Sequence, residues 1–137
     1  MENAILIDVN NEFKLIELDY SSSSFLNDVK MIISDDCSYL GTTKSHFLHE
    51  SFSINPYPFK GNGIIMLIDD NGKMKPHTQN ILASFLHGDV NDYIAGRCII
   101  TGTYYNNLEE SFDYCGLSEH HISLLTAVLS MAKSSIC

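Results

Sequence analysis

The sequence predicts a single α+β domain in which a mixed or antiparallel sheet packs against two or three helices. Three observations support this fold class. The chain has 137 residues, of which 45% are hydrophobic and 18% charged, as expected for one folded domain. Short apolar runs bounded by turn residues indicate strands, and apolar residues repeated every three or four positions indicate helices. We therefore expect residues 1–137 to form one domain.

The N-terminal third predicts a β-hairpin followed by a helix. Two apolar runs, Ala4–Val9 and Phe13–Leu18, flank an asparagine-rich link, which is typical of a hairpin. A serine run then precedes apolar residues that share one helical face. The spacing predicts a helix from Ser24 to Ser34, with the serines available as N-cap.

The segment from Asp35 to Gly63 is expected to be an irregular insertion. Cys37–Gly41 is a possible strand, but Pro56 and Pro58 exclude a helix or a central strand around them. Long irregular segments in small domains are often functional.

A strand, a turn, a helix and a second strand follow, and they form the centre of the predicted domain. Ile64–Ile68 is apolar throughout, which indicates an interior strand covered on both faces. Asp69–Lys73 predicts a tight turn, for which Asn71 and Gly72 supply two residues that tolerate positive φ angles.

The predicted central helix begins near Pro76, with Thr78 as its cap, and ends at Gly88. The second strand is expected over Tyr93–Thr103, where glycines indicate a bulge or a close backbone approach.

The C-terminal region predicts a polar edge and a final helix. Tyr104–Gly116 is polar and acidic and is expected to be a loop or an irregular edge. The last helix begins at Leu117-Ser118-Glu119 with Ser118 as its cap, and its broad apolar face must pack on the domain's own sheet or on a second copy of the chain. We expect a homo-oligomer formed through this helix.

The charge balance limits the classes of partner. The formal net charge is −9, with 8 Lys+Arg against 17 Asp+Glu, which disfavours direct nucleic-acid binding and anionic membranes. The sequence contains neither a membrane-length apolar run nor a signal-peptide pattern, so we expect a cytoplasmic protein. Its four cysteines are expected to be free thiols, with Cys98 in the core.

Catalytic and metal-binding patterns are weak. Two pairs of histidines, His46 with His49 and His120 with His121, lack the further ligands that a metal site requires. Cys115 lies five residues before His120, but no nucleophile signature surrounds it. We expect no metal, no cofactor and no catalytic residue.

Arg97, the single arginine, is the strongest candidate for ligand binding. A cation within an apolar strand needs a partner, which would be either a structural ion pair with an acidic turn or a bound anion. Lys73 and Lys75 could join it from the preceding turn, and tyrosines near the strand could stack on a base. The candidate ligand-binding residues are Arg97, Lys73, Lys75, Asn80 and Tyr93.

The central unit resembles an uncharacterised family of small phage and mobile-element proteins, domain-of-unknown-function family 3846. The matching residues are Asp70-Asn71-Gly72-Lys73-Met74, Asn80, Ala83 and the run Ile94–Gly102, together with the Leu117-Ser118-Glu119 helix start. The longer, proline-rich segment Asp35–Gly63 and the longer last helix depart from the family pattern. The resemblance implies a phage or plasmid context and brings no catalytic residues.

These observations favour a non-enzymatic, phage-type accessory protein that acts in counter-defence by binding. It would sequester a small nucleotide signal near Arg97 or engage a host defence protein through its acidic surface. The alternative is a small enzyme of nucleotide metabolism or hydrolysis.

Overall fold

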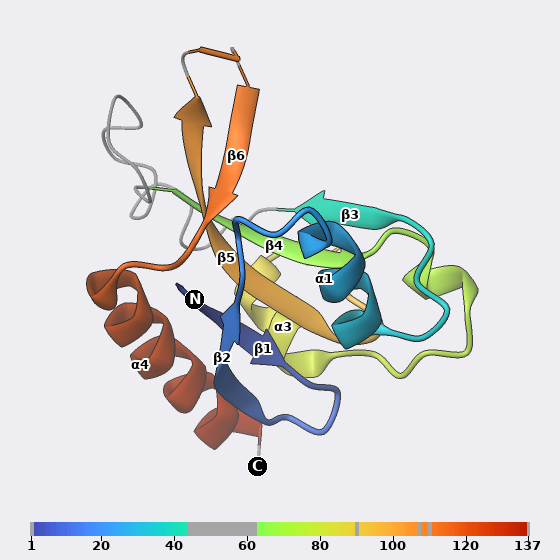
Figure 1. Cartoon of the computed structure of the whole chain (residues 1–137). Helices are drawn as coiled ribbons and strands as arrows, with labels where there is room; N and C mark the ends of the chain where they lie inside the picture. The colour runs from blue at the N-terminus through green and yellow to red at the C-terminus, as the bar shows by residue number, and fades with distance from the viewer. Residues whose placement is uncertain (1, 44–62, 90, 107, 110, 137) are drawn as a thin grey trace.

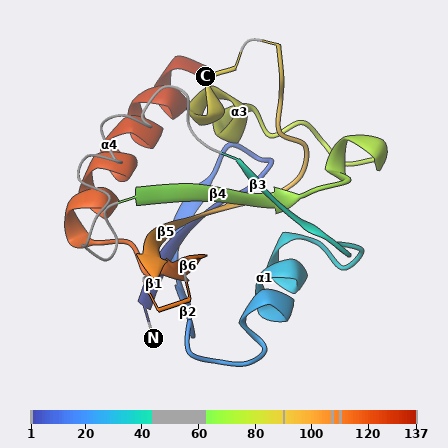
Figure 2. The same ribbon diagram turned by 90° about the horizontal axis from the view of Figure 1, so that it is seen from above.

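The computed structural model confirms the α+β fold. It describes residues 2–43, 63–89, 91–106, 108–109 and 111–136. Within these, six antiparallel strands form one sheet in the order β2-β1-β5-β4-β3, and β6 pairs with β5 (Figures 1 and 2). The elements are β1 Glu2–Ile7, β2 Phe13–Leu18, α1 Phe25–Ile33, β3 Leu40–Thr43, β4 Gly63–Asp69, η1 Gly72–Met74, α3 Ile81–His87, β5 Cys98–Asn106, β6 Ser111–Cys115 and α4 Glu119–Ile136.

Helices cover both faces of the sheet, so the molecule has three layers. Helix α1 packs on one face, and α3 and α4 pack on the other (Figure 2). Side chains of a strand alternate between the two cores: Ile5 and Ile7 face α3 and α4, whereas Leu6 faces α1. The interior position of β4 and its burial on both faces confirm the prediction made from its apolar run.

The predicted N-terminal hairpin and helix are confirmed. Strands β1 and β2 pair throughout their length, and Asn11 takes the positive φ of 66° in their turn. Helix α1 buries Phe25, Val29 and Ile33, one residue from each turn. The strand predicted at Cys37–Gly41 lies three residues further on, at β3. Residues 44–62 of the predicted insertion lie outside the described residues.

The predicted tight turn after β4 is present, but it does not use the positive φ angles that Asn71 and Gly72 tolerate. Asn71 has a φ of −103° and Gly72–Met74 form a 3₁₀ turn, η1. A hairpin turn is not needed there, because β4 pairs with β3 and β5 and not with the segment that follows it. Gly72 serves a close approach instead: a Cβ at this position would lie 2.8 Å from the carbonyl oxygen of Ala95.

The predicted start of the central helix is also wrong, although its end at Gly88 is confirmed by a left-handed φ of 78°. Helix α3 begins at Ile81 and Asn80 is its cap, not Thr78. The preceding residues are held in an extended conformation, because Gly96 donates its N–H to the carbonyl of Thr78 and Asn80 donates to Ile94. This backbone pairing displaces the helix start by several residues.

The second predicted strand begins later and runs further than expected. Residues 93–97 pair with the segment before α3, and Gly96 turns the chain at a φ of 86°, so β5 begins at Cys98. The predicted irregular edge at 104–116 is wrong, because β5 continues to Asn106 and pairs with β6. The pair projects from the body as an arm (Figure 1). Thr101 and Thr103 support it by donating hydroxyl hydrogen bonds to carbonyls of β6.

Helix α4 packs its apolar face on the chain's own core. The Ser118 hydroxyl accepts the N–H of His121 at 3.1 Å, which confirms the predicted cap. Leu125 and Leu129 are buried with residues of the sheet and of α3. Self-association through this helix stays a prediction. Cys98 is a buried core residue, as predicted, and Cys37, Cys98 and Cys115 are free thiols. Within the described residues, none of the helices is both long and apolar enough to span a membrane.

Candidate functional site

A pocket of about 260 Å³ lies beside η1. Strands β3 and β4, η1, the end of α3 and the loop that leads into β5 supply its walls. We call it the His87 pocket; its polar walls are formed by Thr42, Thr43, Asp69, Asp70, Lys73, His87, Asp92 and Tyr93. Because residues from five different segments converge on one concave surface, this is the leading binding-site candidate in the described part of the chain.

His87 lies in the wall of the pocket with its side chain only 4% exposed. Its Nε2 is 3.3 Å from a carboxylate oxygen of Asp92, and its Nδ1 is 3.3 Å from the hydroxyl of Thr43. With Nε2–H donating to Asp92, Nδ1 accepts from Thr43, so both ring nitrogens have partners. A hydroxyl, an imidazole and a carboxylate are therefore arranged in series, in the order found in nucleophilic catalysis.

Lys73 lies at the mouth of this pocket and is already paired. Its ammonium contacts the carboxylate of Asp92 and lies 4.9 Å from the centre of the Tyr93 ring. A carboxylate and an aromatic face together form a cation site. The chain's own lysine thus shows which kind of group this wall accepts.

Asp70 extends the acidic wall toward solvent. Its side chain is exposed, and no ion pair to it is present among the described residues. The pocket walls therefore carry the carboxylates of Asp70 and Asp92 against one lysine, while the buried carboxylate of Asp69 is paired with Lys75.

Lys75 lies on the other side of η1 and neutralises Asp69. The carboxylate of Asp69 is only 1% exposed, and the Lys75 ammonium donates to it at 2.7 Å and to the backbone carbonyl of Asp36 at 2.5 Å. The hydrogen bond to Asp69 raises the pKa of Lys75. Asp36 and His77 complete this group, which we call the Asp69 cluster. The Ser34 hydroxyl, followed by Lys75, lowers the pKa of Asp36.

Arg97 lies outside the His87 pocket and lines a groove whose wall also includes Asp36 and His77 of the Asp69 cluster. It is 47% exposed, its Nε is 3.4 Å from the carboxylate of Asp8, and one terminal nitrogen donates to the carbonyl of Ile32 at 3.1 Å. It precedes β5 and is not inside an apolar strand. Of the two roles considered for Arg97, the structure shows the structural ion pair, made with the turn between β1 and β2.

Asn80 is a structural residue. It is fully buried, its amide nitrogen donates to the carbonyls of Ile7 at 3.0 Å and Gly96 at 2.9 Å, and its oxygen accepts the N–H of Ala83. These three bonds connect β1, the loop before β5 and the first turn of α3. Because the side chain is sealed in the core with its polar atoms engaged, it presents nothing to a ligand.

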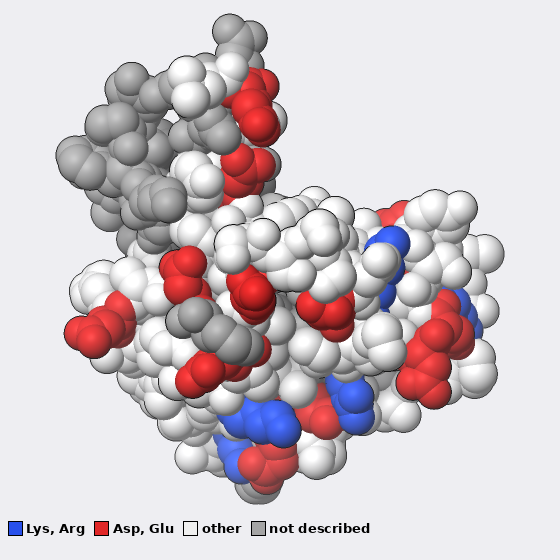
Figure 3. All heavy atoms as spheres, viewed as in Figure 1, with Lys and Arg blue, Asp and Glu red and all other residues white. Residues whose placement is uncertain are grey.

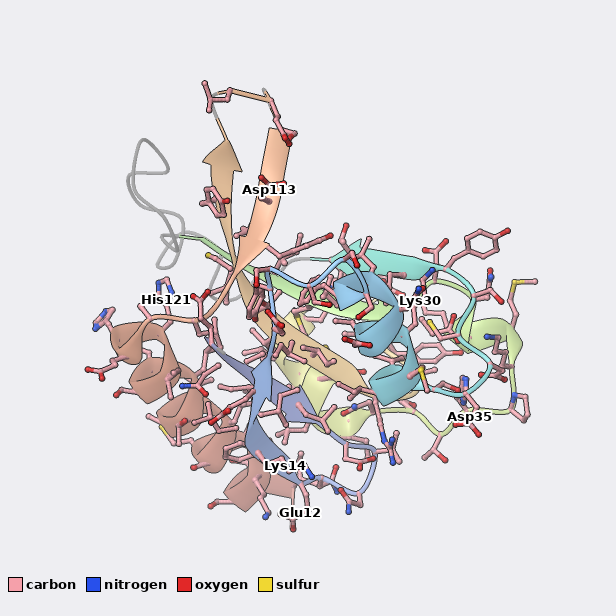
Figure 4. All side chains as sticks on the ribbon, in the orientation of Figure 1. Glu12, Lys14, Lys30, Asp35, Asp113 and His121 are labelled. Atoms are coloured by element: carbon pink, nitrogen blue, oxygen red, sulfur yellow. The ribbon has the colours of Figure 1, made fainter. Side chains whose placement is uncertain are left out.

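The five predicted binding residues therefore do not converge on one site. Only Lys73 and Tyr93 line the His87 pocket. His46 and His49 are outside the described residues, and Figure 4 shows His121 at the start of α4, on the side opposite Asp35 and η1.

The sequence analysis missed His87, Asp92, Thr43 and Asp70. A signal for two of them was present, because His87 and Asp92 are five residues apart around the glycine that ends α3, and a loop of that length can bring them together. Thr43 carries no such signal, since only the pairing of β3 with β4 brings it close to α3.

Searches against protein-family models, curated protein sequences and solved structures gave no match to this chain. The function is therefore argued from the pocket and its chemistry.

Proposed function

We propose that this chain is a non-enzymatic binding protein that takes a lysine or arginine side chain of a partner protein into the His87 pocket. One observation carries the proposal: the pocket wall already holds an ammonium group, that of Lys73, against Asp92 and the ring of Tyr93. The exposed carboxylate of Asp70 in the same wall offers a second anchor for a cation.

Size and charge also support a side chain as the occupant. The pocket of about 260 Å³ is smaller than the roughly 300–1,000 Å³ typical of small-molecule sites. Acidic groups are spread over the visible face of the molecule, from the β5–β6 arm to the η1 end, whereas lysine and arginine appear in few places (Figure 3). With a net charge of −9, long-range attraction favours a basic partner.

The same geometry gives the nucleotide version of the prediction less support. Lys73, Lys75 and Arg97 are each paired with a carboxylate of the chain itself, so a phosphate would have to compete for them. The phage setting and the counter-defence role rest on the sequence resemblance, and in this proposal the basic partner is a host defence protein.

The test uses a fluorescent decapeptide that contains three arginines, compared with the same peptide carrying neutral citrulline. We expect saturable binding of the arginine peptide only, weakening between 50 and 200 mM salt. Asp70→Asn and Asp92→Asn should each weaken binding about two- to five-fold, since an exposed ion pair contributes roughly 0.5–1 kcal/mol. Lys73→Ala should strengthen it, because the internal competitor is removed. Fluorescence anisotropy gives the dissociation constants.

The matched control is Glu17→Gln, which removes one negative charge from β2, at the opposite edge of the sheet. If Glu17→Gln weakens binding as much as Asp70→Asn, the attraction is a property of net charge and the pocket has no role. Weaker binding by Lys73→Ala would also contradict the proposal.

Hydrolysis is the second candidate function, and the series Thr43–His87–Asp92 favours it. In such a reaction the Thr43 oxygen would attack an ester carbonyl while its proton passes to Nδ1 of His87, and Asp92 would stabilise the imidazolium. The ester C–O bond would then break, with the alkoxide or phenolate leaving and taking the proton from His87, and water would hydrolyse the acyl-Thr43 ester to release the acid and restore the hydroxyl. Wild-type protein would then hydrolyse p-nitrophenyl acetate faster than buffer, Thr43→Val would abolish the excess rate, and Thr42→Val would keep it. Equal rates in Thr43→Val and wild type would eliminate this candidate.

A further inference from the structure

Asp36, Lys75 and His77 have no role in the proposed function, yet the Asp69 cluster that they form with Asp69 contains three groups that metal ions favour. Carboxylate oxygens of Asp36 and Asp69 and the Nε2 of His77 all lie within 4.8 Å of one another. They come from the turn after α1, the end of β4 and the loop after η1. The fold therefore brings together residues that are up to 41 positions apart in the sequence.

His77 provides the observation that separates this cluster from an ordinary acidic surface. The side chain as a whole is 21% exposed, but its Nε2 atom is buried and has no hydrogen-bond partner within the described part of the chain. A buried polar atom without a partner costs roughly 1–3 kcal/mol. The atom lies 3.5 Å from Asp36 and 3.6 Å from Asp69, too far for a good hydrogen bond to either.

Those two distances match the spacing of ligand atoms around a metal ion. In a tetrahedral zinc site with bonds of about 2.0–2.1 Å, neighbouring ligand atoms are roughly 3.3–3.4 Å apart. The separations of 3.5 and 3.6 Å around Nε2 are therefore close to the edges of such a tetrahedron. One imidazole with two carboxylates suits a transition-metal ion, whereas Mg²⁺ and Ca²⁺ prefer oxygen ligands alone.

A route for the ion is also present. A groove of about 480 Å³ borders the cluster, and Asp36 and His77 are in its wall together with Asp35, whose position is labelled in Figure 4. The groove leaves room for water in a fourth coordination position.

We propose that Asp36, Asp69 and His77 form a binding site for a divalent transition-metal ion such as Zn²⁺. Lys75 is its competitor, because the ammonium now lies against both carboxylates, 2.7 Å from Asp69 and 3.5 Å from Asp36. A metal ion enters by displacing this side chain, which is partly exposed and can turn toward solvent. Lys75 thus acts as an internal cation that sets the metal affinity.

Isothermal titration of the full chain with ZnCl₂ tests the site. We expect one Zn²⁺ per chain, at least ten-fold weaker binding in His77→Ala, and at least ten-fold tighter binding in Lys75→Met. His120→Ala, which removes an exposed histidine from α4, is the matched control and should bind as the wild type does. Mg²⁺ in place of Zn²⁺ should give no saturable heat.

A second readout guards against variants that fold poorly. The thermal unfolding midpoint of wild type should rise with ZnCl₂, that of His77→Ala should not, and Co²⁺ should give visible absorption bands in wild type alone of these two. Binding to His77→Ala with wild-type affinity, or the absence of saturable Zn²⁺ binding in the wild-type protein, would overturn the proposal. These outcomes are independent of the arginine-peptide experiment.

Discussion

Replacing Asn80 by alanine is expected to lower the free energy of unfolding by about 3–7 kcal/mol. Loss of a helix N-cap costs roughly 1 kcal/mol, and each buried carbonyl left without its donor costs roughly 1–3 kcal/mol. Asn80 provides the cap of α3 and the donors for two carbonyls, those of Ile7 and Gly96. Urea denaturation followed by circular dichroism measures the loss.

Gln79→Ala is the control for this experiment. Its side chain is exposed and lies immediately before Asn80, so the expected change is within about 0.5 kcal/mol. A loss below about 1 kcal/mol in Asn80→Ala would show that the two carbonyls find other donors. The same measurement decides how Asn80 is to be understood, because a ligand-binding residue would affect affinity without such a loss of stability.

Leu129→Ala is expected to cost about 2–5 kcal/mol, the range for truncating a fully buried leucine. Leu129 is 0% exposed and contributes to the core that joins α4, α3 and the sheet. Leu124, on the same helix, is 38% exposed, so Leu124→Ala should cost much less. Denaturation of the two variants in parallel gives the difference, and equal losses would contradict the observed orientation of α4.

Light scattering of the same two variants addresses the predicted homo-oligomer. The inward face of α4 is used by the chain's own core, so self-association would have to use outward residues such as Leu124 and Met131. An oligomer formed by that face should dissociate in Leu124→Ala while its fold is preserved. If Leu124→Ala and Leu129→Ala have the same mass in solution, the outward face of α4 is not an oligomer interface.

The sequence predicts elements well where one local signal dominates. The hairpin β1–β2, the buried strand β4, the Ser118 cap and the end of α3 at Gly88 follow from apolar runs, cap residues and glycine. These features depend on neighbours within a few positions, which a single sequence displays.

The errors have two causes: backbone pairing between separate segments, and the lack of a clear local pattern. Thr78 is a good cap by composition, but pairing between the segments before α3 and before β5 moves the helix start to Asn80. The β5–β6 arm was missed because it lacks a clear alternation of apolar and polar residues. The first error thus depends on a partner segment further along the chain, whereas β6 directly follows β5 in the sequence.

Only part of the candidate site was predicted, because the contacts between its residues depend on the fold. Lys73 and Tyr93 were identified because they adjoin the central turn and strand. The ionic partners that decide their chemistry, such as Asp92 for Lys73, appear only in three dimensions. For Arg97 the sequence left open an ion pair or a bound anion, and the fold shows the ion pair, with Asp8.

Asp69 occupies the wall between two chambers: it lines the His87 pocket and belongs to the cluster on the far side of η1. The same carboxylate therefore lies beside both proposed ligands, the metal ion and the partner's basic side chain. If zinc draws Lys75 away from it, the field felt by a guanidinium in the neighbouring chamber changes, and thermodynamic reciprocity requires the peptide to alter zinc affinity by the same factor. A protein of this size would then have a built-in means of making one binding event conditional on the other.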